Sequence, residues 1–253
     1  MTKNLWITGA GKGIGKSVAF EYAAQGWSVA ISARTNADLS DVSKEARAIG
    51  LPGRILEFPL DVTDHDATKV VFDAIEEELG PLDHIIFNAG THIETPPEKF
   101  TVIPFRVLME VNYMGVVNGL DAVLATLIHR RQGHIAIVSS VAGYGGLPNA
   151  AAYGATKAAL INLCESLYTQ LGDYGVMISV INPGFVRTPL TDRNKFPMPF
   201  LMEPKEAAKV IFSGMAKKKF EIAFPRMFVL ILKFLKILPY SLYFTLVKKI
   251  TKT

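Results

Sequence analysis

The chain of 253 residues has one cysteine, no internal repeat and no low-complexity stretch. A single cysteine excludes an internal disulfide and is typical of proteins from a reducing compartment, so we expect a cytoplasmic location. Cys164 lies in an apolar stretch of helical period, which predicts a small core residue. No secretory signal is evident, because the apolar residues 5–8 lead directly into a glycine-rich loop and predict a buried strand. No linker interrupts residues 1–224, which we expect to form one domain with a sizeable core.

Acidic residues are absent from residues 225–253, a segment that we call the tail. The tail has six basic residues: Arg226, Lys233, Lys236, Lys248, Lys249 and Lys252. Residues 1–224 have 21 basic and 23 acidic residues and are nearly neutral. A nucleic-acid-binding protein would carry its cationic stripes on the folded body. The charge distribution therefore predicts no nucleic-acid partner.

The tail also lacks the run of about 20 apolar residues that a membrane-spanning helix needs. Its longest such stretch, 227–238, has twelve residues and includes two lysines. At 100° per residue, Arg226, Lys233 and Lys236 form one stripe opposite a broad apolar face. Pro239 separates a second amphipathic segment at 240–250. We prefer peripheral attachment to an anionic membrane surface on its cytoplasmic face. The alternative is that the tail packs over the substrate entrance or on another subunit.

Apolar runs of strand length alternate with longer stretches of helical period. This pattern predicts an α/β fold with a single Rossmann-type, doubly wound parallel sheet of about seven strands and helices on both faces. Strands are expected at 5–8, 28–32, 54–58, 84–87, 135–139, 177–181 and 221–224. Helices are expected at 14–25, 37–49, 64–79, 105–129, 151–171 and 204–217, followed by the two helical segments of the tail.

Polar or glycine-rich segments follow six of the predicted strands. These segments are residues 8–15, Arg34, Asp61, residues 88–90, Ser140 and residues 183–188. In open α/β sheets, ligands bind outside the carboxyl ends of the strands, where the strand order reverses. The sequence therefore predicts one functional edge of the sheet.

The first of these segments, GAGKGIG at residues 9–15, can bring backbone N–H groups and a helix N-terminus against a phosphate. Its spacing departs from GxGxxG, since Ile14 stands where the third glycine would fall. A near match to a P-loop, with Lys16 and Ser17 as phosphate and magnesium ligands, predicts a phosphotransferase instead. A P-loop would not explain the pair Tyr153 and Lys157, which is described next.

Tyr153 and Lys157 stand four residues apart in a predicted helix, and Ser140 lies thirteen residues before the tyrosine. Residues at i and i+4 share one helix face, so both side chains can act at the same point. A tyrosine titrates near about 10 and is a poor acid–base catalyst at neutral pH. A neighbouring cation favours the phenolate, so we expect Lys157 to lower the pKa of Tyr153.

With these motifs in this order, residues 4–224 resemble the classical short-chain dehydrogenases/reductases. The family's motifs TGxxxGxG, NAG, a helix asparagine, a serine, YxxxK and PGxxxT fall on Thr8, Gly9, Gly13, Gly15, Asn88, Ala89, Gly90, Asn112, Ser140, Tyr153, Lys157, Pro183, Gly184 and Thr188. One departure is Phe87, where many members have another asparagine. The resemblance implies an oxidoreductase that acts on CH–OH/C=O groups and assembles as a homodimer or homotetramer.

The resemblance also implies a role for each residue. Tyr153 would be the general acid–base, Ser140 would hold the substrate oxygen, and Lys157 would bind the nicotinamide ribose. Asn112 would support a water relay, and Thr188 would fix the carboxamide. The implied cofactor-binding residues are Gly9, Lys12, Gly13, Ile14, Gly15, Arg34, Asp61, Val62, Asn88, Ala89, Gly90, Tyr153, Lys157, Pro183, Gly184, Val186 and Thr188. No metal is implied.

The second predicted strand ends at Arg34 without the acidic residue that would bind a ribose 2′-hydroxyl. Arg34 can hold a 2′-phosphate with two N–H groups, and Lys12 can add a second cation. The sequence therefore predicts NADP(H), with NAD(H) as an alternative because Asp38 can reach a ribose. We expect Asp61 to face the adenine, as the resemblance implies.

An apolar loop at residues 196–202 predicts a flap over a hydrophobic, lipid-like carbonyl or alcohol substrate. These are Phe196, Pro197, Met198, Pro199, Phe200, Leu201 and Met202. A third hypothesis, besides the reductase and the phosphotransferase, is a noncatalytic, membrane-tethered sensor of NADP, since cofactor binding does not prove turnover.

Overall fold

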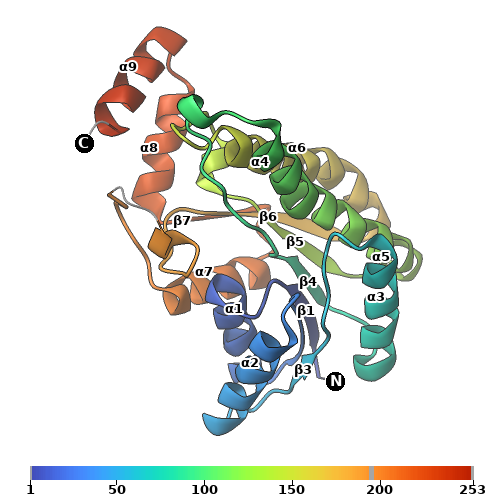
Figure 1. Cartoon of the computed structure of the whole chain (residues 1–253). Coiled ribbons are helices and arrows are strands. Elements are labelled where there is room, and N and C mark those ends of the chain that lie inside the picture. The colour runs from blue at the N-terminus through green and yellow to red at the C-terminus, as the bar shows by residue number, and fades with distance from the viewer. Residues whose placement is uncertain (1, 194–196, 252–253) are drawn as a thin grey trace.

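The computed structural model describes residues 2–193 and 197–251, and within them it contains one seven-stranded sheet (Figure 1). The strands are β1 (Asn4–Thr8), β2 (Ser28–Ser32), β3 (Ile55–Glu57), β4 (His84–Phe87), β5 (His134–Val138), β6 (Met177–Pro183) and β7 (Glu221–Phe224). They are all parallel and lie in the order β3-β2-β1-β4-β5-β6-β7. The order reverses between β1 and β4, where a doubly wound fold places its ligand.

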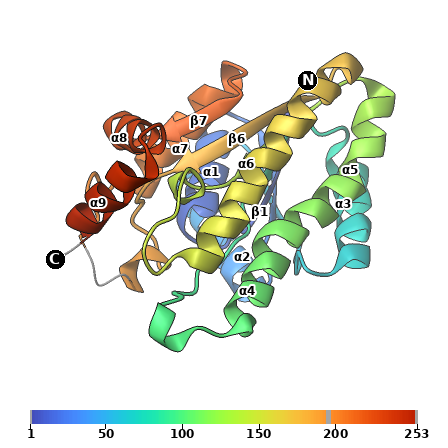
Figure 2. The same cartoon turned by 90° about the horizontal axis from the view of Figure 1, so that it is seen from above.

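Helices cover both faces of the sheet, as Figure 2 shows. One face carries α1 (Gly13–Ala24), α2 (Asn36–Ala48) and α7 (Pro204–Ala216), and the other carries α3 (His65–Leu79), α4 (Val102–Leu108), α5 (Gly115–Arg130) and α6 (Ala151–Leu171). Because both faces are covered, every residue of β1, β2 and β5 is buried, and these strands are almost continuously apolar. The predicted doubly wound α/β fold is confirmed.

A separate apolar cluster lies on each face. Val18, Leu39 and Ile211 belong to the α1/α2/α7 side, whereas Phe72 and Leu160 belong to the other. Cys164 is fully buried in the second cluster, as the sequence predicts, and burial raises the pKa of its thiol to about 12.

The helix predicted at 105–129 begins earlier and is not regular. It runs from Val102 to Arg130 and contains a π-helical segment, η2 (Met109–Met114), between α4 and α5. By length and a mean hydropathy of 1.4 this helix resembles a membrane span, but half of its apolar window is buried inside the protein. Val116, Leu120 and Leu127 pack in the core, so its apolar character serves packing against the sheet.

The tail forms two further helices, α8 (Arg226–Lys236) and α9 (Tyr240–Thr251), beyond the β7 edge of the sheet (Figures 1 and 2). Lys233 of the predicted basic stripe is exposed and forms an ion pair with Glu221 of β7. Leu235, Tyr243 and Val247 form a small apolar cluster between the two helices. The tail therefore packs on the domain.

Two histidines begin adjacent strands and are held neutral by burial. His134 Nε2 lies 2.7 Å from Ser179 Oγ, which itself donates to the Lys219 carbonyl at 2.6 Å. The Ser179 hydroxyl has one proton and donates it to the Lys219 carbonyl, so His134 Nε2 is the donor to Ser179 Oγ. The buried Nδ1 of His134 has no hydrogen-bond partner among the described residues. His84 pairs with His134 across the sheet. Burial lowers the pKa of His84 to about 3 and that of His134 to about 4.

These lowered pKa values predict a loss of stability in acid. In the unfolded chain a histidine takes up a proton below about pH 6.5, whereas in the folded protein both remain neutral until about pH 4. The free energy of unfolding should therefore fall between about pH 6.5 and 4, by up to about 1.4 kcal/mol per pH unit for each histidine. Urea unfolding at pH 7 and pH 5 checks this. His134→Gln keeps a donor for Ser179 and should lose about half of the pH dependence; an unchanged dependence would contradict the account.

Candidate active site

The predicted catalytic residues come from four segments that meet at the carboxyl edge of the sheet. Ser140 follows β5, Asn112 lies in η2, and Tyr153 and Lys157 lie in the first two turns of α6. The helix α6 begins at Ala151, as predicted, so Tyr153 and Lys157 share a face of its buried end.

Tyr153 and Lys157 lie together, with Lys157 buried and Tyr153 half-buried. The Lys157 ammonium is 5.7 Å from the centre of the Tyr153 ring, and its Nζ donates to the Val138 carbonyl at 2.8 Å. Burial lowers the pKa of Lys157 to about 8. Burial also raises the pKa of Tyr153, against the smaller opposing effect of a hydrogen bond with Ser140. The net shift of the Tyr153 pKa is therefore upward, opposite to the expected lowering, because desolvation of the hydroxyl is the largest effect.

Ser140 is fixed by the backbone on either side of it. Its Oγ accepts from the Ala142 amide at 3.1 Å and lies 3.4 Å from the Pro183 carbonyl, to which it donates. The hydroxyl therefore spans the ends of β5 and β6, next to Tyr153. A carbonyl oxygen placed between Ser140 and Tyr153 would meet the Tyr153 hydroxyl and, once the Ser140 hydroxyl turns away from the Pro183 carbonyl, a second donor.

Asn112 is fully buried, and all of its described hydrogen bonds hold neighbouring chain segments. Its Oδ1 accepts from the Thr91 amide at 2.7 Å, and its Nδ2 donates to the Thr91 carbonyl at 3.0 Å and to Thr156 Oγ1 at 3.2 Å. A Cβ at Gly90 would lie only 3.2 Å from Asn112 Oδ1 and 3.6 Å from Lys157 Nζ. Because Gly90 has no side chain, the Asn112 and Lys157 side chains can both lie close to the backbone at residue 90. The predicted water relay stays a prediction.

The glycine loop is shaped to receive a phosphate. Gly9 and Gly13 have φ angles of +66° and +58°, which favour glycine, and a Cβ at Gly15 would lie 2.4 Å from the Gly9 carbonyl oxygen. No side chain caps the N-terminus of α1 at Lys12, so its N–H groups are available to an anion. The loop therefore fits the pyrophosphate of a dinucleotide.

Asn88 and Ala89 hold that loop in place. Asn88 Nδ2 donates to the carbonyls of Thr8 and Gly9, both at 3.0 Å, and the two amides of Asn88 and Ala89 donate to Thr8 Oγ1. Thr188 lies on the other side of the loop, since a Cβ at Gly13 would be 3.0 Å from its Cγ2. The segments that follow β1, β4 and β6 are thus brought together as predicted.

Lys16 does not point into the glycine loop. Its ammonium forms an ion pair with Glu45 of α2 at 2.6 Å and lies 5.5 Å from the ring centre of Phe20. A P-loop lysine would instead reach the phosphates that the loop holds. This geometry gives the phosphotransferase hypothesis no support.

The residues near the end of β2 carry opposite charges. Arg34 is exposed and forms no ion pair with any described residue. Lys12 forms an ion pair with Asp38 at 2.9 Å. The ion pair partly neutralises the Asp38 carboxylate, which was the reason for keeping NAD(H) as an alternative. Asp61 accepts from the amide and the hydroxyl of Thr63 at 3.1 and 2.8 Å and so shapes its own turn.

The other predicted cofactor residues have packing contacts at this edge. Ile14 is partly buried against the α1/α2/α7 core, and Val62 lies against Gly115. Gly184 lies against Phe228 of α8, and Val186 is buried and bridges to Met202. Of the predicted flap, Phe196 lies outside the described residues, whereas Phe200 lies 6.0 Å from Phe228 between ring centres.

The sequence did not indicate two features of the site. The His92 ring stands edge-on to the Tyr153 ring, with 4.9 Å between the ring centres. Burial lowers the pKa of His92, so its imidazole is neutral there. Glu221 accepts from Tyr144 Oη at 2.6 Å and from Asn182 Nδ2 at 3.0 Å, besides pairing with Lys233. Glu221 therefore joins the loop after Ser140, the end of β6 and the tail.

Comparisons with known proteins agree with this arrangement. A family model described as short chain dehydrogenase matches residues 3–197. An uncharacterized oxidoreductase of Myxococcus xanthus is 37% identical over 94% of this chain and 93% of its own length. ElxO with NADP bound has a TM-score of 0.79 at 25% identity, covering 88% of this chain and 98% of its own. A short-chain dehydrogenase/reductase from Burkholderia phymatum in complex with NAD, 23% identical, has the same fold, with a TM-score of 0.84 over 92% of both chains. The chain belongs to the short-chain dehydrogenase/reductase family of oxidoreductases.

Proposed function

We propose that this protein is an NADP(H)-dependent oxidoreductase that transfers a hydride between the nicotinamide and a carbonyl or alcohol group of a hydrophobic substrate. The observation that carries the proposal is the convergence of half-buried Ser140 and Tyr153 with buried Lys157 beside the glycine loop. When bound, the nicotinamide supplies or accepts the hydride. The residues named below hold it and move the proton.

In the direction of reduction, the Tyr153 hydroxyl donates its proton to the substrate oxygen while Ser140 holds that oxygen. The raised pKa of Tyr153 keeps the phenol protonated and ready to donate. The phenolate that forms is stabilised by the Lys157 cation, 5.7 Å from the ring centre. Gly9, Gly13 and Gly15 leave room for the pyrophosphate, and Thr188 would meet the nicotinamide end. Asn112 is held where it supports the segment beside Lys157.

Turnover on a panel of substrates tests the proposal. NADPH oxidation is followed with ketones, aldehydes and the corresponding alcohols of increasing hydrophobicity. We expect NADPH-dependent turnover of at least one hydrophobic carbonyl compound. Tight NADPH binding with no turnover of any compound would favour the sensor hypothesis.

The preference for NADP(H) rests on Arg34. Its guanidinium is exposed beside the end of β2 and forms no ion pair with a described residue, while Lys12 shields Asp38. We expect Arg34→Ala to raise the KM for NADPH by about 10–100-fold, since a charge-assisted bidentate contact contributes about 1.5–3 kcal/mol. The KM for NADH should change less than threefold. Steady-state kinetics with both cofactors measures this, and an equal loss for both would contradict the phosphate-binding role.

The tail is proposed as a peripheral membrane attachment. Exposed apolar side chains lie along α8 and α9: Met227, Leu230, Ile231, Phe234, Ile237, Tyr240, Leu242 and Phe244. Lys236, Lys248 and Lys249 are exposed on the same helices, and the tail has no acidic residue to oppose them. An apolar face with flanking cations is typical of helices that lie in the interface of an anionic bilayer.

Neutralising these cations should weaken the attachment. Each basic residue near an anionic surface contributes about 1 kcal/mol, so the triple variant Lys236→Gln, Lys248→Gln, Lys249→Gln should bind on the order of a hundredfold less tightly. Cosedimentation with phosphatidylcholine/phosphatidylserine vesicles measures this. The matched control replaces Lys217, Lys218 and Lys219, three exposed lysines of the body. Equal losses in both triple variants would contradict a specific role of the tail.

We further propose that the protein is a homodimer or homotetramer, as is common in its family. Phe100, Val102, Ile103 and Val107 leave an exposed apolar strip along α4, with Met109 and Met114 next to it. A second copy of the chain would cover this strip. The oligomeric mass in solution, measured by light scattering, tests this.

A further inference from the structure

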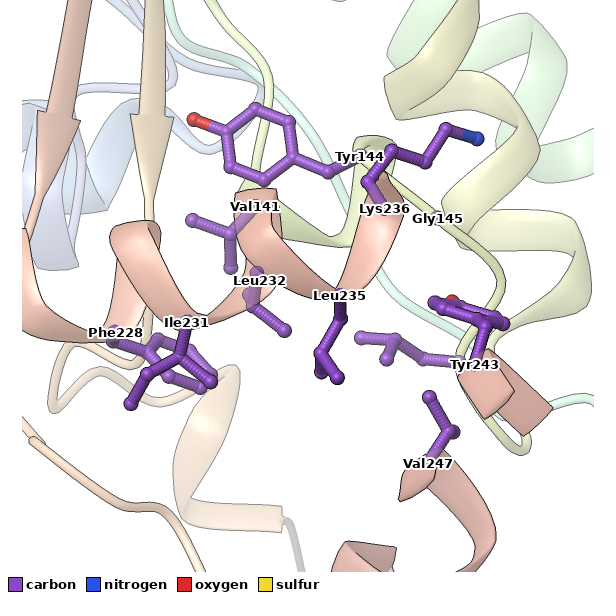
Figure 3. A pocket seen from close by; sticks show the side chains of 11 residues that line it. Val141, Tyr144, Gly145, Phe228, Ile231, Leu232, Leu235, Lys236, Tyr243 and Val247 are labelled. Carbon is purple, nitrogen blue, oxygen red and sulfur yellow. The ribbon is translucent and has the colours of Figure 1, made fainter. Parts of the chain in front are cut away.

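An apolar hollow lies between the loop that follows Ser140 and the two tail helices (Figure 3). Val141 and Leu147 line it from the loop, and Leu232, Leu235, Tyr243 and Val247 line it from α8 and α9. We propose that this hollow, which we call the tail hollow, holds the unbranched hydrocarbon chain of the substrate. This inference rests on the proposed function and names the class of substrate that the site takes.

The polar groups around the tail hollow are engaged elsewhere. Tyr144 donates its hydroxyl to Glu221 at 2.6 Å, and Tyr243 donates its hydroxyl to the Gly146 carbonyl at 2.7 Å. Figure 3 shows the Lys236 ammonium directed away from the apolar side chains. A polar ligand group inside the hollow would therefore lose its hydrogen bonds to water without replacement, which is unfavourable. The chemistry of the lining selects a hydrocarbon.

The size of the tail hollow favours a chain over a ring. Its volume is about 60 Å³. That is well below the roughly 150 Å³ of an apolar cavity that accommodates benzene. A few methylene groups in single file suit this space.

The tail hollow begins next to the reacting groups. Val141 lines the hollow and directly follows Ser140 in the chain. On the opposite side, Phe228 of α8 lies against Gly184 and is stacked on Phe185 at 5.5 Å between ring centres. A substrate whose C–O group lies at Ser140 would thus have its nearest apolar space along Val141 and the inner side of α8.

The walls of the tail hollow are held in place by contacts between the tail and the body. Glu221 pairs with Lys233 of α8, and a Cβ at Gly145 would lie 2.7 Å from the Tyr243 hydroxyl oxygen, so the loop and α9 touch closely. Ile231 lines the hollow and is 40% exposed, which places an opening on the outer side of α8. A chain longer than the hollow can leave there, among the exposed apolar residues of the tail.

Binding of 2-alkanones of increasing length to the Tyr153→Phe variant in the presence of NADPH tests the inference without turnover. Each methylene group buried should increase affinity about fourfold, so the gain across the two or three groups that the hollow holds should exceed tenfold. Ile231→Trp should fill the opening and abolish this gain. Leu230→Trp is the matched control, because Leu230 is the preceding residue, is 61% exposed and does not line the hollow. Leu232→Ala should move the gain to chains one to three carbons longer.

The outcomes separate the two proposals. A chain-length dependence that is lost in Ile231→Trp and kept in Leu230→Trp supports the tail hollow as the chain site. The same dependence in both variants, or none in the parent, overturns it. If the alkanones bind with the predicted dependence but the wild-type enzyme oxidises no NADPH with any of them, the proposed function fails while the binding site stands.

Discussion

Replacing Tyr153 with phenylalanine is expected to reduce kcat by about 10²–10⁴-fold, the usual contribution of a positioned general acid. The variant loses only the hydroxyl, and the ring keeps its contacts with His92 and Lys157. NADPH affinity, measured by fluorescence titration, should change less than threefold. The result would assign the loss to proton transfer and not to cofactor binding.

The matched control is Tyr144→Phe. Tyr144 is also a partly buried tyrosine near Ser140 in the chain, but its hydroxyl donates to Glu221 of β7 at 2.6 Å. It should keep most of the activity. If Tyr153→Phe retained wild-type kcat, or if Tyr144→Phe lost as much, Tyr153 would not be the acid–base residue.

Replacing Lys157 with methionine is expected to reduce kcat/KM for reduction by about 10²–10³-fold, because the phenolate loses its cation. Methionine nearly fills the same buried volume, so the packing of α6 against β5 should survive. The variant gives up one buried hydrogen bond, to the Val138 carbonyl at 2.8 Å. Circular dichroism and NADPH titration distinguish a folded, inactive variant from an unfolded one.

The pH profile gives this prediction a second readout. Burial lowers the pKa of Lys157 to about 8, so the lysine is a cation below that pH and neutral above it. Wild-type kcat/KM for reduction should therefore decline as the pH rises through about 8. Lys157→Met has no group that titrates there and should lack this decline. A variant with the same decline would show that another group controls it.

The sequence predicted the fold well because burial on both sheet faces leaves a strong pattern. Strands β2, β4 and β7 and the helix α6 have the predicted bounds, and the glycines at 26, 50 and 80 follow helices α1, α2 and α3. The π-helical segment carrying Asn112 was missed, since a wider turn of only six residues is too short to leave a distinct apolar period in the sequence. Its presence beside Lys157 agrees with the common use of such turns at functional sites.

Contacts between distant residues account for what the sequence did not show. The Lys12–Asp38 pair and the Glu221 cluster join residues that no local pattern connects. Glu221 is 77 residues from Tyr144, yet it contacts both Tyr144 and Lys233. Amphipathicity predicted a helix here, but the side that contacts the domain depends on tertiary packing of Val229, Phe228 and Leu235.

The most direct test of the account follows the hydride itself. The protein is incubated with NADPH deuterated at C4 of the nicotinamide and a ketone that it reduces, and the alcohol is analysed by mass spectrometry and NMR. The account predicts one deuterium on the carbinol carbon, and the Tyr153→Phe variant should form the same labelled alcohol about 10²–10⁴-fold more slowly. An alcohol formed without deuterium on that carbon would contradict direct transfer at this site.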